Sequence, residues 1–231
     1  MNEVLRNEKK YLISLVRYYA LSHLLAQALH LDGHSAGDGY SIRSLYFDTI
    51  EEKDFVEKED GVEVRRKIRL RNYGPHMPFA MLEMKQKQGY NQKKRSLRVK
   101  RADAEELCRG RYASLLRYPD PFAAECYALM NTQCYLPKAV VEYRRKAFVA
   151  QENNIRVTFD HHIIGTEANF DIFSPNLMQY PVMDPYLVVL EVKYNGFLLS
   201  YIKDMLRVTD TSELSVGKYS LSRAVTTHYH F

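Results

Sequence analysis

The segment from Val62 to Arg71 alternates between two kinds of side chain. In Val-Glu-Val-Arg-Arg-Lys-Ile-Arg-Leu-Arg, Glu63 and every second residue after it are charged and mostly basic. The positions between them are apolar, with the exception of Arg66. A period of two is that of a β-strand, whose successive side chains point to opposite faces. The segment therefore predicts a strand with one apolar face and one cationic face.

The same alternation recurs in four other segments, at 6–10, 79–87, 155–160 and 187–193. In each of them, basic side chains and single carboxylates share one face. For a single strand, a solvated outer face is the ordinary explanation. Because like charges on adjacent strands repel each other, repeated basic faces favour a bound anion that neutralises them. We therefore expect an antiparallel sheet closed into a barrel, with its cations around one polyanion.

Helices are expected between these strands and outside the sheet. Their positions are 15–30, 103–116 with a start resembling a capping box, from Asp120-Pro121 onward, 198–208, and a short one after Gly217. The segments 73–78 and 174–181 are expected to be loops. The fold class predicted for this chain of 231 residues is α+β, in a single domain over 1–231.

Composition and charge argue against several classes of protein. No apolar run approaches the roughly 20 residues that a membrane-spanning helix needs, and the first six residues do not resemble a secretory signal. The spacing of Cys108, Cys126 and Cys134 fits neither a zinc site nor a disulfide framework, so we expect buried thiols in a reducing, cytoplasmic compartment. The net charge of +5 is too modest to identify a partner.

Eight short motifs resemble, in their order along the chain, the VTC domain, which is the polyphosphate-polymerase domain of the vacuolar transporter chaperone complex. The motifs lie between residues 6 and 222 and are Glu8-Lys-Lys-Tyr-Leu-Ile13, Ile42-Arg-Ser-Leu-Tyr-Phe-Asp-Thr49, Lys67-Ile-Arg-Leu-Arg-Asn-Tyr-Gly74, Leu82-Glu-Met-Lys85, Tyr143-Arg-Arg-Lys-Ala-Phe148, Ile155-Arg-Val-Thr-Phe-Asp160, Leu190-Glu-Val-Lys193 and Lys218-Tyr219. This family has free-standing bacterial members and belongs to the triphosphate tunnel metalloenzymes. The resemblance implies an eight-stranded antiparallel β-barrel whose basic lumen holds a tri- or polyphosphate.

The resemblance also implies a reaction and the residues of its site. The family transfers the γ-phosphoryl group of ATP to a polyphosphate chain with a divalent metal, Mn²⁺ or Mg²⁺. Its catalytic basic positions fall on Lys10, Arg69, Arg71 and Lys218. Its other phosphate-binding positions fall on Lys85, Arg145, Arg156 and Lys193, with Lys58 and Lys93 as further basic matches. Its metal-binding glutamate falls on Glu191.

These residue types suit phosphoryl transfer. A loose transition state needs positioning and charge neutralisation more than covalent help. Arginine binds phosphate oxygens in a bidentate manner, whereas lysine acts as a point charge. A hard cation would take oxygen ligands from Glu191 and from the phosphates.

Two departures from the family pattern keep other functions open. Hydrolytic relatives begin with Glu-x-Glu-x-Lys, but here Arg6 replaces the first carboxylate, which favours transfer over a water-activating mechanism. The segment Leu214-Ser-Val-Gly217 also lacks the polar pair that often precedes the final lysine. Two alternatives remain: a metal-dependent triphosphatase, and a non-catalytic polyanion-binding module that senses or stores polyphosphate or docks on a membrane-associated partner. Nucleic acid is not an expected partner, because a closed basic lumen excludes a duplex.

Structural roles are expected for four other polar residues. Asp48 and Asp160 are predicted to support the site or the fold. His161 and His162 are adjacent, and neighbouring residues of a strand point to opposite faces, so a turn is favoured over a metal site.

Overall fold

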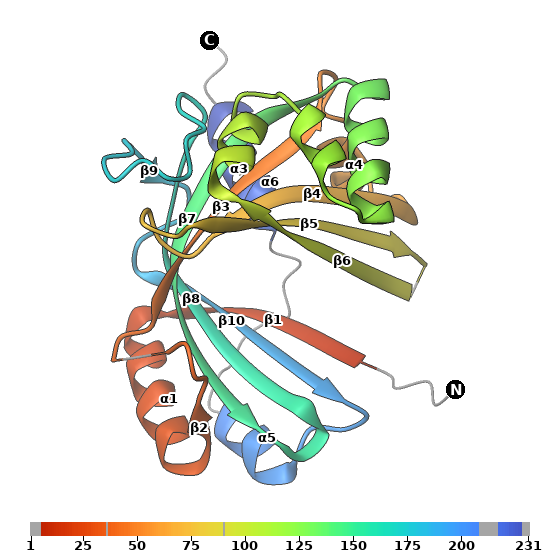
Figure 1. Cartoon of the computed structure of the whole chain (residues 1–231). Helices are drawn as coiled ribbons and strands as arrows, with labels where there is room; N and C mark the ends of the chain where they lie inside the picture. The colour runs from red at the N-terminus through yellow and green to blue at the C-terminus, as the bar shows by residue number, and fades with distance from the viewer. Residues whose placement is uncertain (1–5, 36, 90, 208–216, 228–231) are drawn as a thin grey trace. The chain divides into compact units, whose positions relative to one another are not determined.

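The structure is a computed structural model that describes residues 6–35, 37–89, 91–207 and 217–227 (Figure 1). Its strands form one sheet in the order β1-β10-β8-β7-β3-β4-β5-β6, to which the short strands β2 and β9 are added. The strand bounds are β1 Arg6–Ser14, β2 His30–Leu31, β3 Tyr40–Thr49, β4 Val64–Asn72, β5 Phe79–Gln88, β6 Asn91–Lys100, β7 Tyr135–Ala150, β8 Ile155–Thr166, β9 Tyr180–Pro181 and β10 Leu187–Asn195. The expected α+β class, with a large antiparallel sheet, is confirmed. The described residues show no pairing between β1 and β6, the two ends of this order, so the sheet is not closed by hydrogen bonds as the expected eight-stranded barrel would be.

The chain folds into two compact units. Unit 1 comprises residues 1–41, 143–163 and 183–217, and unit 2 comprises 42–142, 164–182 and 218–231. Each unit has its own hydrophobic core. The expectation of a single domain over 1–231 stays a prediction.

In unit 1, two helices cover the apolar face of the strands (Figure 1). They are α1 Leu15–Ala28 and α5 Ser200–Arg207. The Ser14 side chain accepts a hydrogen bond from Arg17 N at 3.3 Å, which caps the start of α1. Leu25 of α1 and Leu190 of β10 are fully buried in this core. Burial of one face leaves the charged residues of β1, β8 and β10 on the other.

In unit 2, helices pack on the apolar face of β4, β5 and β6 (Figure 1). The helical segments of this unit are α2 Lys53–Glu59, α3 Arg101–Cys108, a 3₁₀ turn at Ala113–Arg117, α4 Pro121–Thr132 and α6 Lys218–Thr227. Asp120 caps α4 by accepting from Phe122 N at 2.8 Å, and proline occupies the first turn as predicted. Ile68 and Leu82 of the sheet are fully buried in the core that the sheet forms with α3, the 3₁₀ turn and α4.

The predicted helix over 103–116 is wrong in its extent. Helix α3 ends at Cys108, because Gly110 has a φ of 73° and a separate 3₁₀ turn follows. Asp103 lies inside the helix instead of capping it, and its carboxylate accepts hydrogen bonds from Arg117 and Tyr118 at 2.7 Å. The other four helices begin and end close to their predicted positions.

Three smaller predictions are also wrong. His161 and His162 lie within β8 and not at a turn, although the φ of 54° at His162 distorts the strand locally. Cys134 is exposed, whereas Cys108 and Cys126 are buried as expected. The apolar face of β4 begins only at Ile68, because Val64 near its start is exposed.

No helix among the described residues combines the length and the apolar character needed to span a membrane. The residues 214–216 of the C-terminal motif, and the Arg6 side chain, lie outside the part of the chain that is described.

Candidate functional site

Charged residues from three adjacent strands meet on one face of unit 1. Glu8 of β1 is paired in register with Lys193 of β10, and Lys193 is paired with Arg156 of β8. In the next row of that face, Lys10 is paired with Glu191. We call these five residues the charged face of unit 1. The predicted alternation of β1, β8 and β10 therefore places Lys10, Arg156, Glu191 and Lys193 together.

Two lysines and two glutamates alternate on this face. Lys10 Nζ lies 2.8 Å from Glu8 Oε1 and 3.9 Å from Glu191 Oε2. Lys193 Nζ lies 2.5 Å from Glu191 Oε1 and 3.6 Å from Glu8 Oε2. Each ammonium thus bridges both carboxylates.

Glu191 is an ionised carboxylate in a buried position. Its residue is only 7% exposed, and burial acts to raise the pKa of the carboxyl group. The positive charges of Lys193 and Lys10 lower the pKa by more than burial raises it, so the pKa of Glu191 lies below its usual value. The carboxylate is therefore charged at neutral pH, as a metal ligand must be.

Glu8 and Glu191 carry carboxylate oxygens, which are the kind of ligand that hard divalent cations take. Mg²⁺ is usually held by one or two carboxylates together with substrate phosphates, and not by a complete protein cage. The described residues contain no group of three or more His, Cys, Asp or Glu able to hold a metal ion. Two carboxylates alone would not complete the coordination of such a cation, and phosphate oxygens would have to supply further ligands.

Arg145 is held rigidly by Asp160. Its Nε and Nη2 atoms donate to the two carboxylate oxygens at 2.6 and 2.7 Å, and the Asp160 side chain is fully buried. Burial acts to lower the pKa of Arg145, but Asp160 raises it well above its ordinary value. Asp160 therefore has the supporting role expected of it, by fixing a guanidinium next to Glu191.

Only some of the hydrogen-bond donors of the Arg156 guanidinium have a partner among the described residues. Its Nη2 atom donates to Asp32 and, at 3.2 Å, to the Tyr40 hydroxyl group. Its buried Nε atom has no hydrogen-bond partner there. A buried donor without a partner is costly, which makes this guanidinium a candidate to bind an acceptor oxygen.

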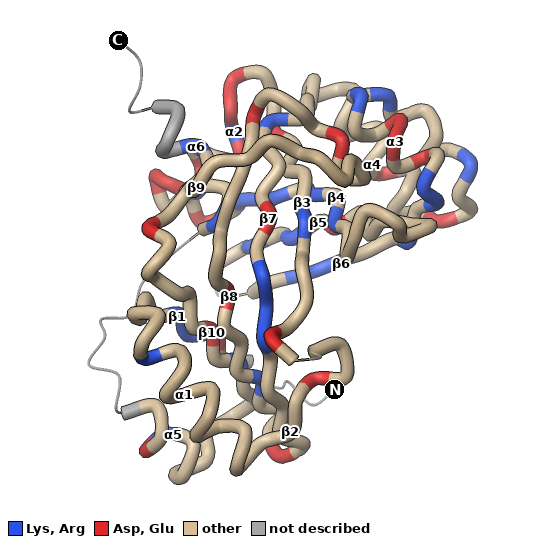
Figure 2. Tube along the Cα trace, turned by 90° about the vertical axis from the view of Figure 1, so that its left-hand side faces the viewer, with Lys and Arg blue, Asp and Glu red and all other residues tan. Residues whose placement is uncertain are grey.

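Unit 2 presents a more strongly basic face. Three register rows of β4, β5 and β6 carry it: Lys67–Lys85–Lys94, Arg69–Glu83–Ser96 and Arg71–Met81–Arg98. Lys and Arg are seen along β4, β5 and β6 in Figure 2. We call Lys67, Arg69, Arg71, Lys85 and Lys94 the basic face of unit 2.

One carboxylate, Glu83, lies among these cations. Arg69 Nε donates to Glu83 Oε2 at 2.7 Å, and Arg71 Nε lies 3.8 Å from the same oxygen. Lys94 forms an ion pair with Glu83 Oε1. Burial acts to raise the pKa of Glu83, but Arg69, Arg71 and Lys94 together lower it to about 2. Three cations around one carboxylate leave an excess of positive charge.

Tyr46 extends the basic face of unit 2 onto β3. It is paired in register with Arg69 and is buried. Burial acts to raise the pKa of its phenol, but Arg69, Lys67 and Lys218 lower it to about 8. Lys67 Nζ lies 5.4 Å from the centre of this ring and 5.6 Å from that of Tyr219, and the two rings stack at 5.2 Å. The predicted Lys218 is thereby brought near Arg69.

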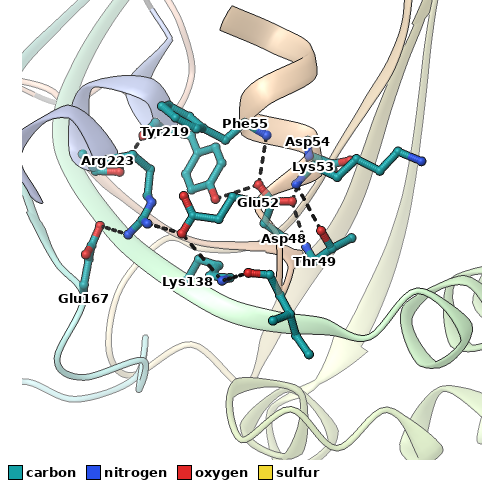
Figure 3. Close-up of polar contacts among 12 residues, drawn as sticks. Asp48, Thr49, Glu52, Lys53, Asp54, Phe55, Lys138, Glu167, Tyr219 and Arg223 are labelled. Atoms are coloured by element: carbon teal, nitrogen blue, oxygen red, sulfur yellow. Dashed lines mark hydrogen bonds and ion pairs between the residues drawn. The ribbon is translucent and has the colours of Figure 1, made fainter. Parts of the chain in front are cut away.

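Helix α6, which carries Lys218, is anchored by its next turns (Figure 3). The Tyr219 hydroxyl group donates to Asp48 Oδ2 at 2.9 Å. Arg223 donates to Glu167 at 2.6 Å and also to Glu52. Asp48 further accepts from the backbone amides of Thr49, Asp54 and Phe55, so it has the structural role expected of it.

Two predicted phosphate-binding residues lie apart from these faces. Lys58 is in α2, where its Nζ lies 3.1 Å from Glu59. Lys93 is paired with Gln86, one position from the Lys85–Lys94 row, so it alternates with Lys94 across the strand. Lys94 of β6 is paired with Lys85 and lies on the basic face of unit 2. It was not among the residues predicted from the sequence.

The sequence model of the VTC domain family matches residues 5–227. This chain belongs to the VTC domain family. No curated protein matches it. The family match spans both units of this VTC domain and includes every residue placed on the two faces.

Solved structures of other proteins share the fold of this VTC domain. HpAC1 from Hippeastrum, a candidate adenylyl cyclase described as having a dominant triphosphatase activity, is 12% identical, with a TM-score of 0.57 over 96% of this chain and 96% of that chain. A candidate adenylate cyclase from Bacillus halodurans is 12% identical, with a TM-score of 0.53 over 94% and 96%. The Mediator head module of Schizosaccharomyces pombe is 9% identical, with a TM-score of 0.52 over 91% and 100%. These likenesses show the fold, and activity must be argued from the site.

Proposed function

We propose that this chain is an ATP-dependent polyphosphate polymerase that transfers the γ-phosphoryl group of ATP to an inorganic polyphosphate chain. Its membership of the VTC domain family supports this activity. The observation that carries the proposal is the clustering of Arg69, Arg71 and Lys94 around the carboxylate of Glu83, with Lys67 and Lys85 in the neighbouring row of the same face. Such a surplus of cations on one sheet face suits a ligand with several negative charges.

The basic residues act by binding and by neutralising charge. Lys10, Arg69, Arg71 and Lys218 contact the reacting phosphates and stabilise the charge that spreads over their oxygens during transfer. Arg145, held by Asp160, and Arg156, with its unpartnered Nε atom, orient further phosphates. The other phosphate-binding residues in the proposal are Lys58, Lys85, Lys93 and Lys193.

Glu191 holds a divalent cation, Mn²⁺ or Mg²⁺, together with the phosphates. When bound, the metal neutralises charge on the transferring group and orients its oxygens. In the absence of phosphate, Lys10 and Lys193 neutralise Glu191. Phosphate oxygens compete for both ammonium groups, which frees the carboxylate to ligate the cation.

A triphosphatase is the second candidate, because HpAC1 has this fold and is described as having that activity. The two reactions differ only in the acceptor, which is water in hydrolysis and a polyphosphate end in transfer. A non-catalytic module that binds polyphosphate, or docks on a membrane-associated protein, is the third.

One assay separates these functions. The chain is incubated with ATP and Mn²⁺, with and without a short polyphosphate primer, while polymer length and free phosphate are followed together. Growth of the polymer supports the polymerase, release of phosphate alone supports the triphosphatase, and tight polyphosphate binding without turnover supports the module.

Glu191→Gln tests the metal assignment in the same assay. We expect it to lose at least about 100-fold in turnover, because it removes a ligand charge that the reaction requires. Glu105→Gln on α3, whose carboxylate pairs with Arg101 at 2.9 Å, is the matched control and is expected to keep full turnover. Full metal-dependent turnover of Glu191→Gln would overturn the assignment.

A further inference from the structure

One face of helix α6 carries side chains that are bound by carboxylates of unit 2 (Figure 3). Tyr219 and Arg223 are four residues apart, so they lie on the same face of the helix. The Tyr219 hydroxyl group donates to Asp48 Oδ2 at 2.9 Å. The Arg223 guanidinium donates to Glu167 Oε1 at 2.6 Å and also to Glu52 Oε1. One arginine thus joins α6 to the segment that follows β8 and to the start of α2.

The ion pairs of Arg223 are largely removed from water. The Arg223 side chain is 13% exposed, and those of Glu167 and Glu52 are 18% and 24% exposed. Burial acts to lower the pKa of Arg223, but Glu167 and Glu52 raise it above its ordinary value. Breaking a pair of this kind is costly, because it leaves a poorly hydrated charge without its partner. The guanidinium therefore stays charged and fixed between the two carboxylates.

Glu52 is itself held by a second cation. Its φ of 58° lies in the left-handed region, which a residue other than glycine adopts only where surrounding contacts hold it. Lys138 of β7 supplies such a contact, because its Nζ lies 3.7 Å from Glu52 Oε1 and donates to the Ile50 carbonyl oxygen at 3.2 Å. These contacts join α6, β7 and the start of α2. We call the residues that make them the α6 clamp: Arg223, Glu52, Glu167 and Lys138.

Lys218, the first residue of α6, lies among other cations. Its charge acts on the buried phenol of Tyr46, as do the charges of Arg69 and Lys67. Positive charges around one ring repel each other, so the start of α6 is pushed away from the basic face of unit 2 unless other contacts hold it. Arg223 lies five residues further on, about 7.5 Å along the helix axis. A helix of this length transmits a restraint at Arg223 to its first residue.

We propose that Arg223 is a positioning residue of the phosphate site, whose ion pairs in the α6 clamp hold Lys218 in place against this repulsion. The inference rests on the proposed function for the role of Lys218, which is to bind phosphate. Arg223 contacts the carboxylates of the clamp and acts on the phosphate only through Lys218. A phosphate at the basic face of unit 2 therefore meets Lys218 already in position, and less affinity is lost in ordering the start of the helix.

A double-mutant cycle tests the proposal through the affinity for tripolyphosphate, measured without ATP or metal. We expect Lys218→Gln to weaken binding about tenfold and Arg223→Gln about three- to tenfold, because each affects the same charge-assisted contact. Since Arg223 acts through Lys218, the double variant should bind no more weakly than Lys218→Gln alone. Arg223→Lys keeps the charge but not the fork of donors, so its affinity should lie between that of Arg223→Gln and that of the unchanged chain.

Two further variants separate positioning from stability. Arg43 is three residues from Tyr46 and so lies on the opposite face of β3. Its side chain is 11% exposed and donates to Glu142 at 2.7 Å, so Arg43→Gln is the matched control, expected to lower stability and to keep normal affinity. Glu167→Gln removes one of the two pairs of Arg223 and should weaken binding less than Arg223→Gln. It provides the same test if Arg223→Gln does not fold, which urea unfolding shows.

Three outcomes would overturn the proposal. The first is normal affinity in folded Arg223→Gln. The second is additive losses in the double variant, which would show that Arg223 acts independently of Lys218. The third is a loss in Arg43→Gln as large as in Arg223→Gln, which would trace the effect to stability alone.

The binding results also distinguish this proposal from the proposed function. Normal affinity in Lys218→Gln would remove the proposed role of Lys218, and the positioning role of Arg223 would fail with it. A loss in Lys218→Gln without a loss in Arg223→Gln would remove the positioning role alone. Failure of the polymerase assay leaves all of these binding results intact.

Discussion

Arg69 and Glu83 are paired in register across β4 and β5, and Arg69 Nε donates to Glu83 Oε2 at 2.7 Å. This ion pair holds in place a guanidinium that the proposed reaction uses. It also means that a phosphate must compete with Glu83 for Arg69. The same carboxylate is therefore expected to stabilise the fold and to weaken the binding of a phosphate ligand.

Glu83→Gln is expected to lower stability and to tighten phosphate binding. The free energy of unfolding falls by about 1–3 kcal/mol at neutral pH, because three cations lose their common counter-ion. Since the pKa of Glu83 is lowered from 4.5 to about 2, its contribution is present above pH 4.5 and is lost as the pH falls towards 2. Denaturant unfolding against pH checks this: the variant should show a flatter slope in that window. Weaker tripolyphosphate binding by the variant would contradict the account.

Tyr46→Phe is expected to change the pH dependence of phosphate binding. The pKa of Tyr46 is lowered to about 8, so its phenol ionises as the pH rises through 8 and places a negative charge beside Arg69. Tripolyphosphate affinity of the unchanged chain should therefore fall between pH 7 and 9 more steeply than that of the variant. Isothermal titration at several pH values measures this, and identical profiles for the two proteins would contradict it.

Tyr219→Phe tests whether the anchor of α6 positions Lys218. The variant loses the hydroxyl group that donates to Asp48 at 2.9 Å, at a cost of about 1–3 kcal/mol in stability. We expect turnover to fall several-fold at a temperature where the protein remains folded, because Lys218 begins the same helix. Tyr201→Phe on α5 alters an exposed tyrosine and is expected to have neither effect. Full activity of Tyr219→Phe would show that the anchor serves stability alone.

The three cysteines are expected to react with a thiol reagent at two different rates. Burial raises the pKa of Cys108 and of Cys126 to about 12, so neither thiol is accessible or ionised. Cys134 is exposed and should be modified first. Counting fast-reacting thiols in the folded chain checks this, with Cys134→Ser as the control that removes the fast phase. A fast phase of more than one thiol would contradict the assigned burial.

The two faces of β4 could be predicted from the sequence, because successive side chains of a strand point to opposite faces whatever its neighbours are. The alternation predicted correctly that Arg69 and Arg71 share a face, and the β1, β8 and β10 patterns did the same for Lys10 and Glu191. The register between neighbouring strands could not be predicted, because it depends on the length and geometry of the connecting hairpin. Lys93, a match from the family resemblance, alternates along β6 with Lys94, and the register of the hairpin places Lys94 in the row of Lys67 and Lys85.

Contacts between side chains of different strands and helices could not be predicted from the sequence either. The bidentate pair of Arg145 with Asp160 joins β7 to β8, and the Tyr46–Tyr219 stack joins β3 to α6. Neither follows from local spacing, since both depend on tertiary packing. The lowered pKa of Tyr46 is a consequence of three cations that the fold assembles around it.

The most direct test of the account measures tripolyphosphate binding by two single variants, one from each unit. Lys10→Gln removes a cation from the charged face of unit 1, and Arg69→Gln removes one from the basic face of unit 2. Each variant is expected to weaken binding about tenfold or more, because each removes a charge-assisted contact to phosphate. Unchanged affinity in both variants, with the fold intact by circular dichroism, would contradict the claim that these sheet faces bind phosphate.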